Sequence, residues 1–304
     1  MKKFLIYISG FSILVFILFG GVELLLLLVP NEYTYKLNYL KRHKDDIKCL
    51  VIGNSHASTG IDAGRLGDSA FNAAISGRFI YYDAKLAELY IPEMRNLRFV
   101  IMPLSYDTQY FSYQYKDIWN YPSDFETTYR CMYAKYAGIY YNNERQYCSE
   151  ILFSKMNLLG RLLGRNQIMC DSLGLERFPL TERRNDWDKA SLVRERLKSH
   201  KNAEKCVDEI TGYFERICKV CKDANVQLIL FTIPYYKTAR DSVTQTGVKE
   251  MHSIAERLCR CYGVKYHDYM YDNRFSEADF KNATHLNELG AAKLSDIIRE
   301  DFLK

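Results

Sequence analysis

The stretch Cys49-Leu50-Val51-Ile52-Gly53-Asn54-Ser55-His56 joins an apolar run to a short polar segment that contains a serine. A short apolar run of this kind is typical of a buried strand in a parallel sheet. Ser55 then lies just after the carboxyl end of the strand, at the edge where open α/β sheets bind their ligands. We therefore expect Ser55 to belong to a functional site.

Similar apolar runs recur along the chain and alternate with helical patterns. The strand-like runs are Ile47 to Ile52, Ala70 to Ala74, Phe99 to Leu104, Val226 to Ile233 and Val264 to Tyr266. The helical patterns cover Tyr81 to Tyr90, Lys201 to Cys221, Val248 to Cys261 and Leu289 to Phe302. This alternation predicts an α/β fold, a three-layer α/β/α sandwich around a parallel sheet.

A histidine near the end of the chain is the natural partner of Ser55. The segment Asn282-Ala283-Thr284-His285-Leu286-Asn287 precedes the predicted final helix. A histidine on a loop before that helix can turn towards the edge of the sheet. Ser55 and His285 therefore form a candidate serine–histidine catalytic pair, in which His285 takes the proton of the serine hydroxyl.

Acyl transfer by a serine also needs donors that point at the developing oxyanion. The backbone N–H of Ser55, at a turn from strand to helix, is one candidate. Gly77 is another, because it follows a second predicted strand and a glycine lets a substrate approach the backbone closely.

These segments together resemble the SGNH or GDSL-type hydrolases. The first block of that family, Gly-Asp-Ser followed by a glycine, is similar to Gly53-Asn54-Ser55 with Gly60. The second block, which carries an oxyanion glycine, is similar to Asn72 to Gly77, and the last block, Asp-x-x-His, is similar to Asn282 to His285. The resemblance implies a flavodoxin-like parallel sheet and a covalent acyl-Ser55 intermediate.

The chain departs from this family pattern at two places. The family has an oxyanion asparagine after its third strand, where this chain has Ser105, which can donate instead. Asn282 stands where the family has an aspartate, so it can orient the imidazole but cannot stabilise imidazolium by charge. Asp279 or Glu288 can supply the missing charge, and the sequence does not choose between them.

The chain begins with a long apolar segment. Phe4 to Val29 is almost wholly apolar, and about 20 helical residues suffice to cross a bilayer. We expect residues 1–30 to be an uncleaved transmembrane anchor that contacts the membrane through residues 4–29, with Glu23 at the interface. Because the amino-terminal tail is very short, we expect a single-pass protein of the cell membrane with its globular part outside the cytoplasm.

The remaining chain divides into a short linker and one large domain. Residues 31–46 are polar and charged and predict a stalk, and residues 47–304 form the predicted SGNH-like domain with an insertion at about residues 107–189. Tyr106 and ten further tyrosines up to Tyr147 crowd into that insertion, together with Trp119. They can stack on sugar rings or form the insertion's own core, because tyrosine is amphipathic.

Composition restricts the function classes. The 304-residue chain is 48% hydrophobic, enough for a large core, and its net charge of +5 with no basic stripe argues against a nucleic-acid partner. The nine cysteines include Cys218-x-x-Cys221 and Cys259-x-Cys261, which can pair or stay buried as thiols. No histidine completes a zinc set at the usual spacing, so no metal or cofactor is expected.

His56, directly after Ser55, has two interpretations. It either contacts substrate or is a solvated capping residue.

The sequence supports two functional hypotheses. The first is a membrane-anchored serine esterase or O-acyltransferase that acts on a cell-envelope glycan through acyl-Ser55. By resemblance, such a protein can act alongside a multi-spanning membrane acyltransferase. The alternative is a catalytically degenerate SGNH-fold protein that serves as a glycan-binding or accessory subunit of an envelope polysaccharide system.

Overall fold

The apolar runs after residue 46 form a five-stranded sheet in this computed structural model. Its strands are β1 (Cys49–Val51), β2 (Ala70–Asn72), β3 (Phe99–Pro103), β4 (Gln227–Thr232) and β5 (Lys265–Asp268). Their order is β2-β1-β3-β4-β5, and every pairing is parallel. This is the flavodoxin-like order. The expected fold class is therefore confirmed.

The structure describes residues 1–110, 112, 136–139, 149, 151, 160, 163, 168–177, 181, 183–190 and 203–303. The chain falls into two units, one formed by residues 1–35 with 122–169 and one by residues 36–121 with 170–304. The sheet and the site described below belong to the second unit.

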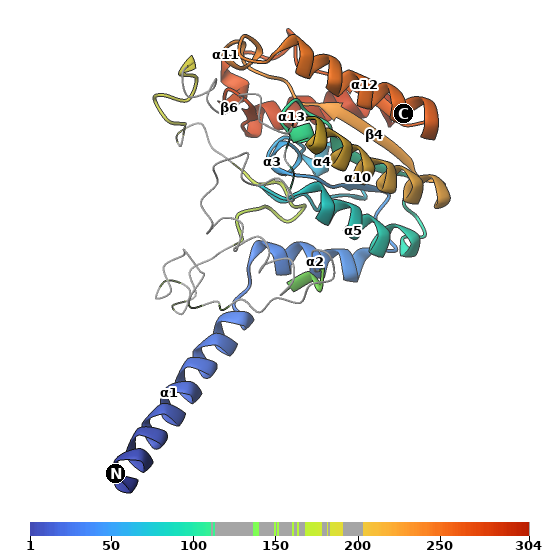
Figure 1. Ribbon diagram of the computed structural model, residues 1–304. Coiled ribbons are helices and arrows are strands. Elements are labelled where there is room, and N and C mark those ends of the chain that lie inside the picture. Colours follow the sequence, from blue (N-terminus) through green and yellow to red (C-terminus); the bar gives the residue numbers. More distant parts are fainter. Residues whose placement is uncertain are drawn as a thin grey trace. The chain divides into compact units, whose positions relative to one another are not determined.

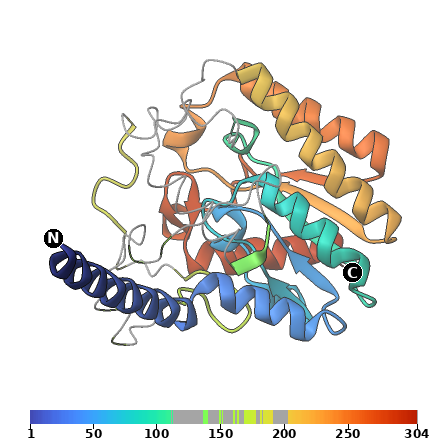
Figure 2. The same ribbon diagram turned by 60° about the horizontal axis from the view of Figure 1, so that its bottom comes forward.

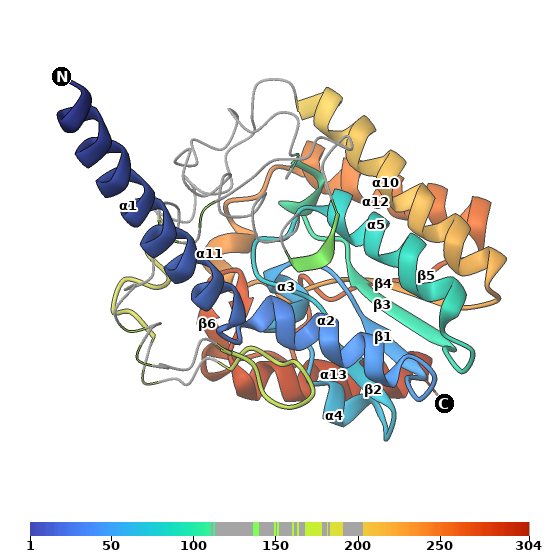
Figure 3. The same cartoon turned by 90° about the horizontal axis from the view of Figure 1, so that it is seen from below.

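Helices cover both faces of the sheet. Helices α5 (Ile80–Tyr90), α10 (Ala203–Asp223) and α12 (Gln245–Tyr262) pack together on one face (Figure 1). Helices α4 (Ala63–Leu66) and α13 (Glu288–Phe302) pack together on the other face (Figure 3), and Figure 2 shows the same separation of α13 from α5 and α10. Right-handed crossovers between parallel strands produce this distribution.

The remaining elements are short. They are α3 (Ser55–Ser58), α11 (Lys237–Arg240), the 3-10 turns η1 (Ile91–Glu93), η2 (Thr108–Tyr110) and η7 (Glu277–Asp279), and the hairpin of β6 (Phe280–Asn282) and β7 (His285–Leu286). The hairpin is antiparallel and pairs Asn282 with His285. It therefore brings the two ends of the last sequence motif together.

The core lies between the sheet and its helices, and the central strands are buried on both sides. Leu50, Ile101 and Ile229 have no exposed surface. This explains why the strands read as continuous apolar runs rather than as alternating patterns. Each predicted strand and each predicted helix is present. Strands β1 to β4 are shorter than the predicted runs, and at Gly53, after β1, the backbone turns away with φ +128°. Strand β5 instead extends two residues beyond its run, to Asp268.

Helix α2 (Glu32–His43) lies within the segment for which the sequence predicts a stalk. From Lys36 onward it packs on the sheet: Leu37 and Leu40 are buried, and the ring of Tyr39 stacks on Phe71 of β2 with centroids 3.9 Å apart. The buried Lys36 ammonium donates a hydrogen bond to the Ala74 carbonyl. This part of the predicted stalk is thus a helix with a buried face.

The first unit contains helix α1 (Lys2–Leu28), which has a mean hydropathy of 2.6 and is long and apolar enough to cross a membrane. Glu23, predicted to lie at a membrane interface, is buried within this unit. Its carboxylate accepts hydrogen bonds from Ser149 Oγ at 2.9 Å and from the Ile151 N–H at 3.2 Å. The carboxylate therefore has protein partners.

Most of the tyrosine-rich insertion lies outside the described residues, including Trp119, and its two interpretations stay predictions there. Tyr106 and Tyr110 are described, and both are buried. The Tyr106 hydroxyl lies 3.2 Å from Thr244 Oγ1, and the Tyr110 hydroxyl donates to Glu250 at 2.8 Å. These two tyrosines are core residues beside α12.

Candidate active site

Ser55 lies on a tight turn between β1 and α3. Gly53 has φ +128°, and a Cβ built there would lie 2.6 Å from Pro103 Cδ, so only glycine fits. Asn54 is the N-cap of α3, and its side-chain oxygen accepts the His56 N–H at 3.0 Å. The sequence thus fixes the serine where the strand stops and the helix starts.

A buried ion pair stabilises this turn. The side chains of Arg78 and Asp83 are each 1% exposed, and Arg78 Nη2 lies 2.6 Å from Asp83 Oδ1. The Gly53 N–H donates a hydrogen bond to the same Asp83 oxygen at 3.0 Å. Burial raises the pKa of the Asp83 carboxyl to about 6, although the Arg78 guanidinium acts in the opposite direction. The carboxylate fixes the backbone two residues before Ser55.

His285 lies in the β6–β7 hairpin, directly before α13. Asn287 caps that helix, because its side-chain oxygen accepts the N–H groups of Leu289 and Gly290 at 2.9 and 3.1 Å. His285 itself is only 6% exposed. The cap and the hairpin together hold the imidazole in place on the loop.

The structure brings Ser55, His285 and Asn282 together. Ser55 Oγ lies 2.8 Å from His285 Nε2, and His285 Nδ1 lies 3.1 Å from Asn282 Oδ1. The same Asn282 atom accepts the Thr284 N–H at 3.0 Å, which identifies it as the amide oxygen. Because that oxygen can only accept, it favours a proton on Nδ1. Nε2, which faces Ser55 Oγ, can then accept the proton of the serine hydroxyl.

The two other candidate acids lie elsewhere. The Asp279 carboxylate is 2.6 Å from the Lys293 ammonium and accepts the Ser276 N–H at 2.7 Å. Glu288 is exposed in the first turn of α13. Of the three residues considered from the sequence, Asn282 is therefore the one that the structure places against His285 Nδ1.

Hydrogen bonds fix the loop that runs from β2 to Gly77. The Asn72 amide donates to the carbonyls of Ala57 and Ile61, at 2.8 Å each, and accepts the Ala74 N–H. The Ser76 N–H donates to the buried Glu176 carboxylate at 3.1 Å. Gly77 follows with φ +74°, a conformation that favours glycine.

The three predicted oxyanion donors share one property. Among the described residues, no hydrogen bond occupies the N–H of Ser55, the N–H of Gly77 or the hydroxyl of Ser105. Ser105 follows β3 and is completely buried. A buried hydroxyl without a partner is costly, so its presence at the same edge of the sheet as Ser55 and Gly77 agrees with its predicted role as an oxyanion donor.

His56 belongs to a second polar cluster, which sequence reasoning missed. Its ring is 1% exposed, so it is not a solvated cap, and its centroid lies 4.8 Å from that of His285. His56 Nδ1 is 3.6 Å from Asp107 Oδ1, which also accepts the Tyr235 hydroxyl at 3.1 Å. Asp107 and Tyr235 each follow a predicted strand, and that shared position was the available signal.

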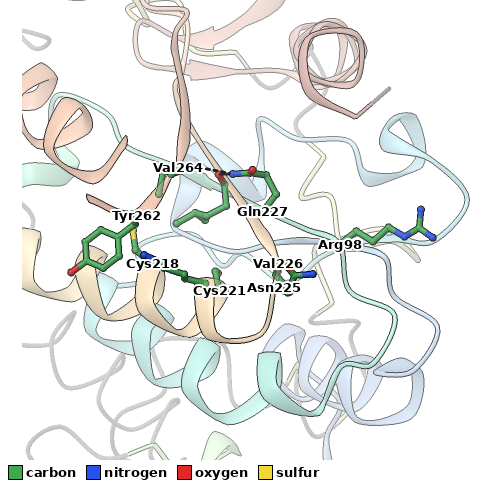
Figure 4. A pocket seen from close by; sticks show the side chains of 11 residues that line it. Arg98, Cys218, Cys221, Asn225, Val226, Gln227, Tyr262 and Val264 are labelled. Carbon is green, nitrogen blue, oxygen red and sulfur yellow. Dashed lines mark hydrogen bonds between the residues drawn. The ribbon is translucent and has the colours of Figure 1, made fainter. Parts of the chain in front are cut away.

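A second hollow lies at the amino ends of β4 and β5, the opposite edge of the sheet (Figure 4). It has a volume of about 300 Å³, and its lining includes Arg98, Lys222, Cys218 and Cys221. Burial raises the pKa of the Cys221 thiol to about 12. The seven cysteines in the described part of the chain form no disulfide with one another, and no group of three or more metal-ligating side chains occurs among the described residues.

Comparison with known proteins gives a distant likeness. No protein-family model and no curated protein matches the chain. A provisionally assigned acylhydrolase from Bacteroides fragilis is 11% identical with a TM-score of 0.40, over 87% of this chain and 94% of its own. A GDSL-like lipase from Bacteroides thetaiotaomicron is 10% identical with a TM-score of 0.40, over 89% and 98%. An aryl esterase from M. smegmatis, in an inhibitor-bound form, is 9% identical with a TM-score of 0.38, over 84% and 97%.

Proposed function

We propose that this protein is a membrane-anchored serine esterase or O-acyltransferase that acts on a cell-envelope glycan through an acyl-Ser55 intermediate. The observation that carries the proposal is the 2.8 Å contact between Ser55 Oγ and His285 Nε2, with Asn282 on the other ring nitrogen. A hydroxyl, a base and a group that orients the base are the minimal set for nucleophilic acyl transfer.

His285 Nε2 receives and returns a proton in each half of this mechanism. Ser55 Oγ attacks the carbonyl carbon of the acyl donor while its proton passes to His285 Nε2. The bond to the leaving alkoxide then breaks, and the alkoxide takes that proton, which leaves acyl-Ser55. Water or a sugar hydroxyl gives its own proton to His285 as it attacks the acyl carbon, and Ser55 is released with its proton restored.

Three donors are available for the oxyanion formed in both steps. They are the N–H groups of Ser55 and Gly77 and the hydroxyl of Ser105, which have no competing hydrogen bond among the described residues. Donors that are fixed before the reaction stabilise the developing charge without reorganisation.

The membrane and the glycan are further parts of the proposal. Helix α1 is long and apolar enough to cross a bilayer, and an anchored enzyme meets substrates at the membrane surface. We infer a single span, a globular part outside the cytoplasm, an envelope glycan as acyl donor or acceptor, and a multi-spanning acyltransferase as a possible source of acyl groups.

A second candidate function rests on the partner of His285. Asn282 is neutral, and an imidazolium beside an amide lacks the charge stabilisation that a carboxylate gives. This favours a catalytically degenerate protein that binds glycan as an accessory subunit. Glycan binding without turnover in the wild type, unchanged by Ser55→Ala and His285→Ala, is the result that selects this function.

A serine-reactive fluorophosphonate probe tests the enzyme proposal on the full chain in detergent. We expect one label per chain, located at Ser55 by peptide mass, and no label in Ser55→Ala. Ser253→Ala, which removes an exposed serine on α12, should be labelled like the wild type. Equal labelling of wild type and Ser55→Ala shows that Ser55 is not the nucleophile.

Turnover is measured separately from labelling. The wild type should release acetate from an O-acetylated glycan or transfer acetyl to it, and Ser55→Ala should do neither. Labelling at Ser55 without any turnover of acetylated glycans would keep the nucleophile and reject the proposed substrate.

A further inference from the structure

His285 lies in a buried site, and Asn282, which lies against its Nδ1, is neutral. The proposed reaction, on which this inference rests, places a positive charge on its ring in each step. Asn282 offers only an amide dipole to stabilise that charge, and both Asp279 and Glu288 lie elsewhere. A carboxylate within a few ångströms of the ring would stabilise it, because charges interact strongly where water is excluded.

Asp107 is a carboxylate beside His56, the ring that neighbours His285. Its Oδ1 is 3.6 Å from His56 Nδ1, and the His56 ring meets the His285 ring edge-on, with centroids 4.8 Å apart and planes at 62°. His56 is 1% exposed and Asp107 is 20% exposed. One buried imidazole therefore separates the carboxylate from the base.

The position of Asp107 is set by two neighbouring strands. Asp107 follows β3, and Tyr235, whose hydroxyl donates to Asp107 Oδ1 at 3.1 Å, follows β4. Tyr235 is itself 2% exposed. The carboxylate is thus fixed at the same edge of the sheet as Ser55, which follows β1.

We propose that Asp107, acting through His56, supplies the negative charge that Asn282 lacks. The Asp107 carboxylate faces His56 Nδ1 at 3.6 Å, and the His56 ring lies between that carboxylate and His285. The proton from Ser55 remains on His285 until the leaving alkoxide takes it. Asp107 and His56 are positioning residues in this scheme, because they act on the base and not on the substrate.

A double-mutant cycle separates this role from a structural one. Asp107→Asn should lower kcat by about ten- to hundredfold with little change in KM. Asn282→Asp places a carboxylate directly on His285 Nδ1, and it suits this position because Asn282 Oδ1 already accepts from Thr284 and His285. In that background we expect Asp107→Asn to cost less than about threefold.

A charge-conserving variant and a measurement of thermal unfolding complete the test. Asp107→Glu keeps the charge and should retain kcat within about threefold, and all variants should unfold in the same temperature range as the wild type. Equal losses from Asp107→Asn in both backgrounds, or no loss in the wild type, overturn the inference while Ser55 labelling stands. A wild type without label at Ser55 overturns the proposed function, and this inference with it.

Discussion

The two edges of the sheet are built by the same strands, yet they differ in what they offer a ligand. Of the two hollows described, the larger, about 300 Å³, lies at the amino edge, where the Gln227 amide donates to the Gly263 carbonyl at 3.2 Å. The hollow beside Gly53 at the carboxyl edge is about 10 Å³, but this edge has the Ser55–His285 contact and the Ser105 hydroxyl, which has no partner among the described residues. Directed polar groups, and not the volumes of these two hollows, are the reason why we place the proposed chemistry at the carboxyl edge.

The largest expected effect is the loss of the base at the carboxyl edge. His285→Ala should lower the rate of Ser55 acylation by about 10³-fold or more, because His285 Nε2 is the base that contacts Ser55 Oγ among the described residues. The rate is measured as single-turnover labelling or ester hydrolysis. His252→Ala removes a histidine that pairs with Asp268 at 2.7 Å, and it should leave the rate within twofold. A small effect of His285→Ala would remove the distinction between the two edges.

Ser105→Ala tests the unpaired hydroxyl. We expect kcat to fall by about 10²-fold, as for other oxyanion donors, while the free energy of unfolding stays constant or rises. Stability should not fall because the hydroxyl is buried without a partner in the described chain. Chemical denaturation and kinetics on the same samples check both halves. Unchanged kcat would exclude Ser105 from the oxyanion site.

A pair of glycine variants compares backbone strain at the two edges. Gly53 and Gly263 both have positive φ, but an added Cβ meets Pro103 at 2.6 Å at Gly53 and nothing within 4 Å at Gly263. Gly263→Ala should cost about 1 kcal/mol of unfolding free energy, and Gly53→Ala about 2 kcal/mol more. Urea denaturation measures both, and equal costs would show that Pro103 yields without strain.

The smallest effect is expected at the amino edge. Arg98 lines the larger hollow and is exposed, so Arg98→Ala should change neither acylation nor ester hydrolysis by more than twofold. Steady-state kinetics checks this prediction. A tenfold loss would show that the larger hollow takes part in the reaction after all.

Sequence reasoning was accurate where the signal is local. Each buried strand corresponds to a continuous apolar run, and each amphipathic helix corresponds to apolar residues repeated at the helical period. These two patterns were sufficient to predict the order of elements and the fold class. The turn Gly53 to His56 was equally readable, because strand, glycine, cap and helix are adjacent in the chain. The motif Asn282 to His285 was found for the same reason.

Other features depend on residues far apart in the sequence. Asn282, and not Asp279, lies against His285 Nδ1. The Asp279 carboxylate instead pairs with the Lys293 ammonium on α13, at 2.6 Å. The buried state of His56 and its approach to Asp107 depend on the packing of three strand ends. The packing of α2 on the sheet was missed because its residues are mainly polar. Its buried side chains are Lys36, Leu37 and Leu40, and Tyr39 stacks on Phe71.

The sequence by itself determined the strands, the helices, the apolar amino-terminal segment and the two motifs that carry Ser55 and His285, because hydrophobic period and turn chemistry act over a few residues. The tertiary structure alone decided that Ser55 Oγ and His285 Nε2 lie 2.8 Å apart across 230 residues. It also decided that the His56 ring lies beside that of His285, with the Asp107 carboxylate 3.6 Å from His56. Such contacts follow from how parallel strands align their carboxyl ends, which no local pattern encodes.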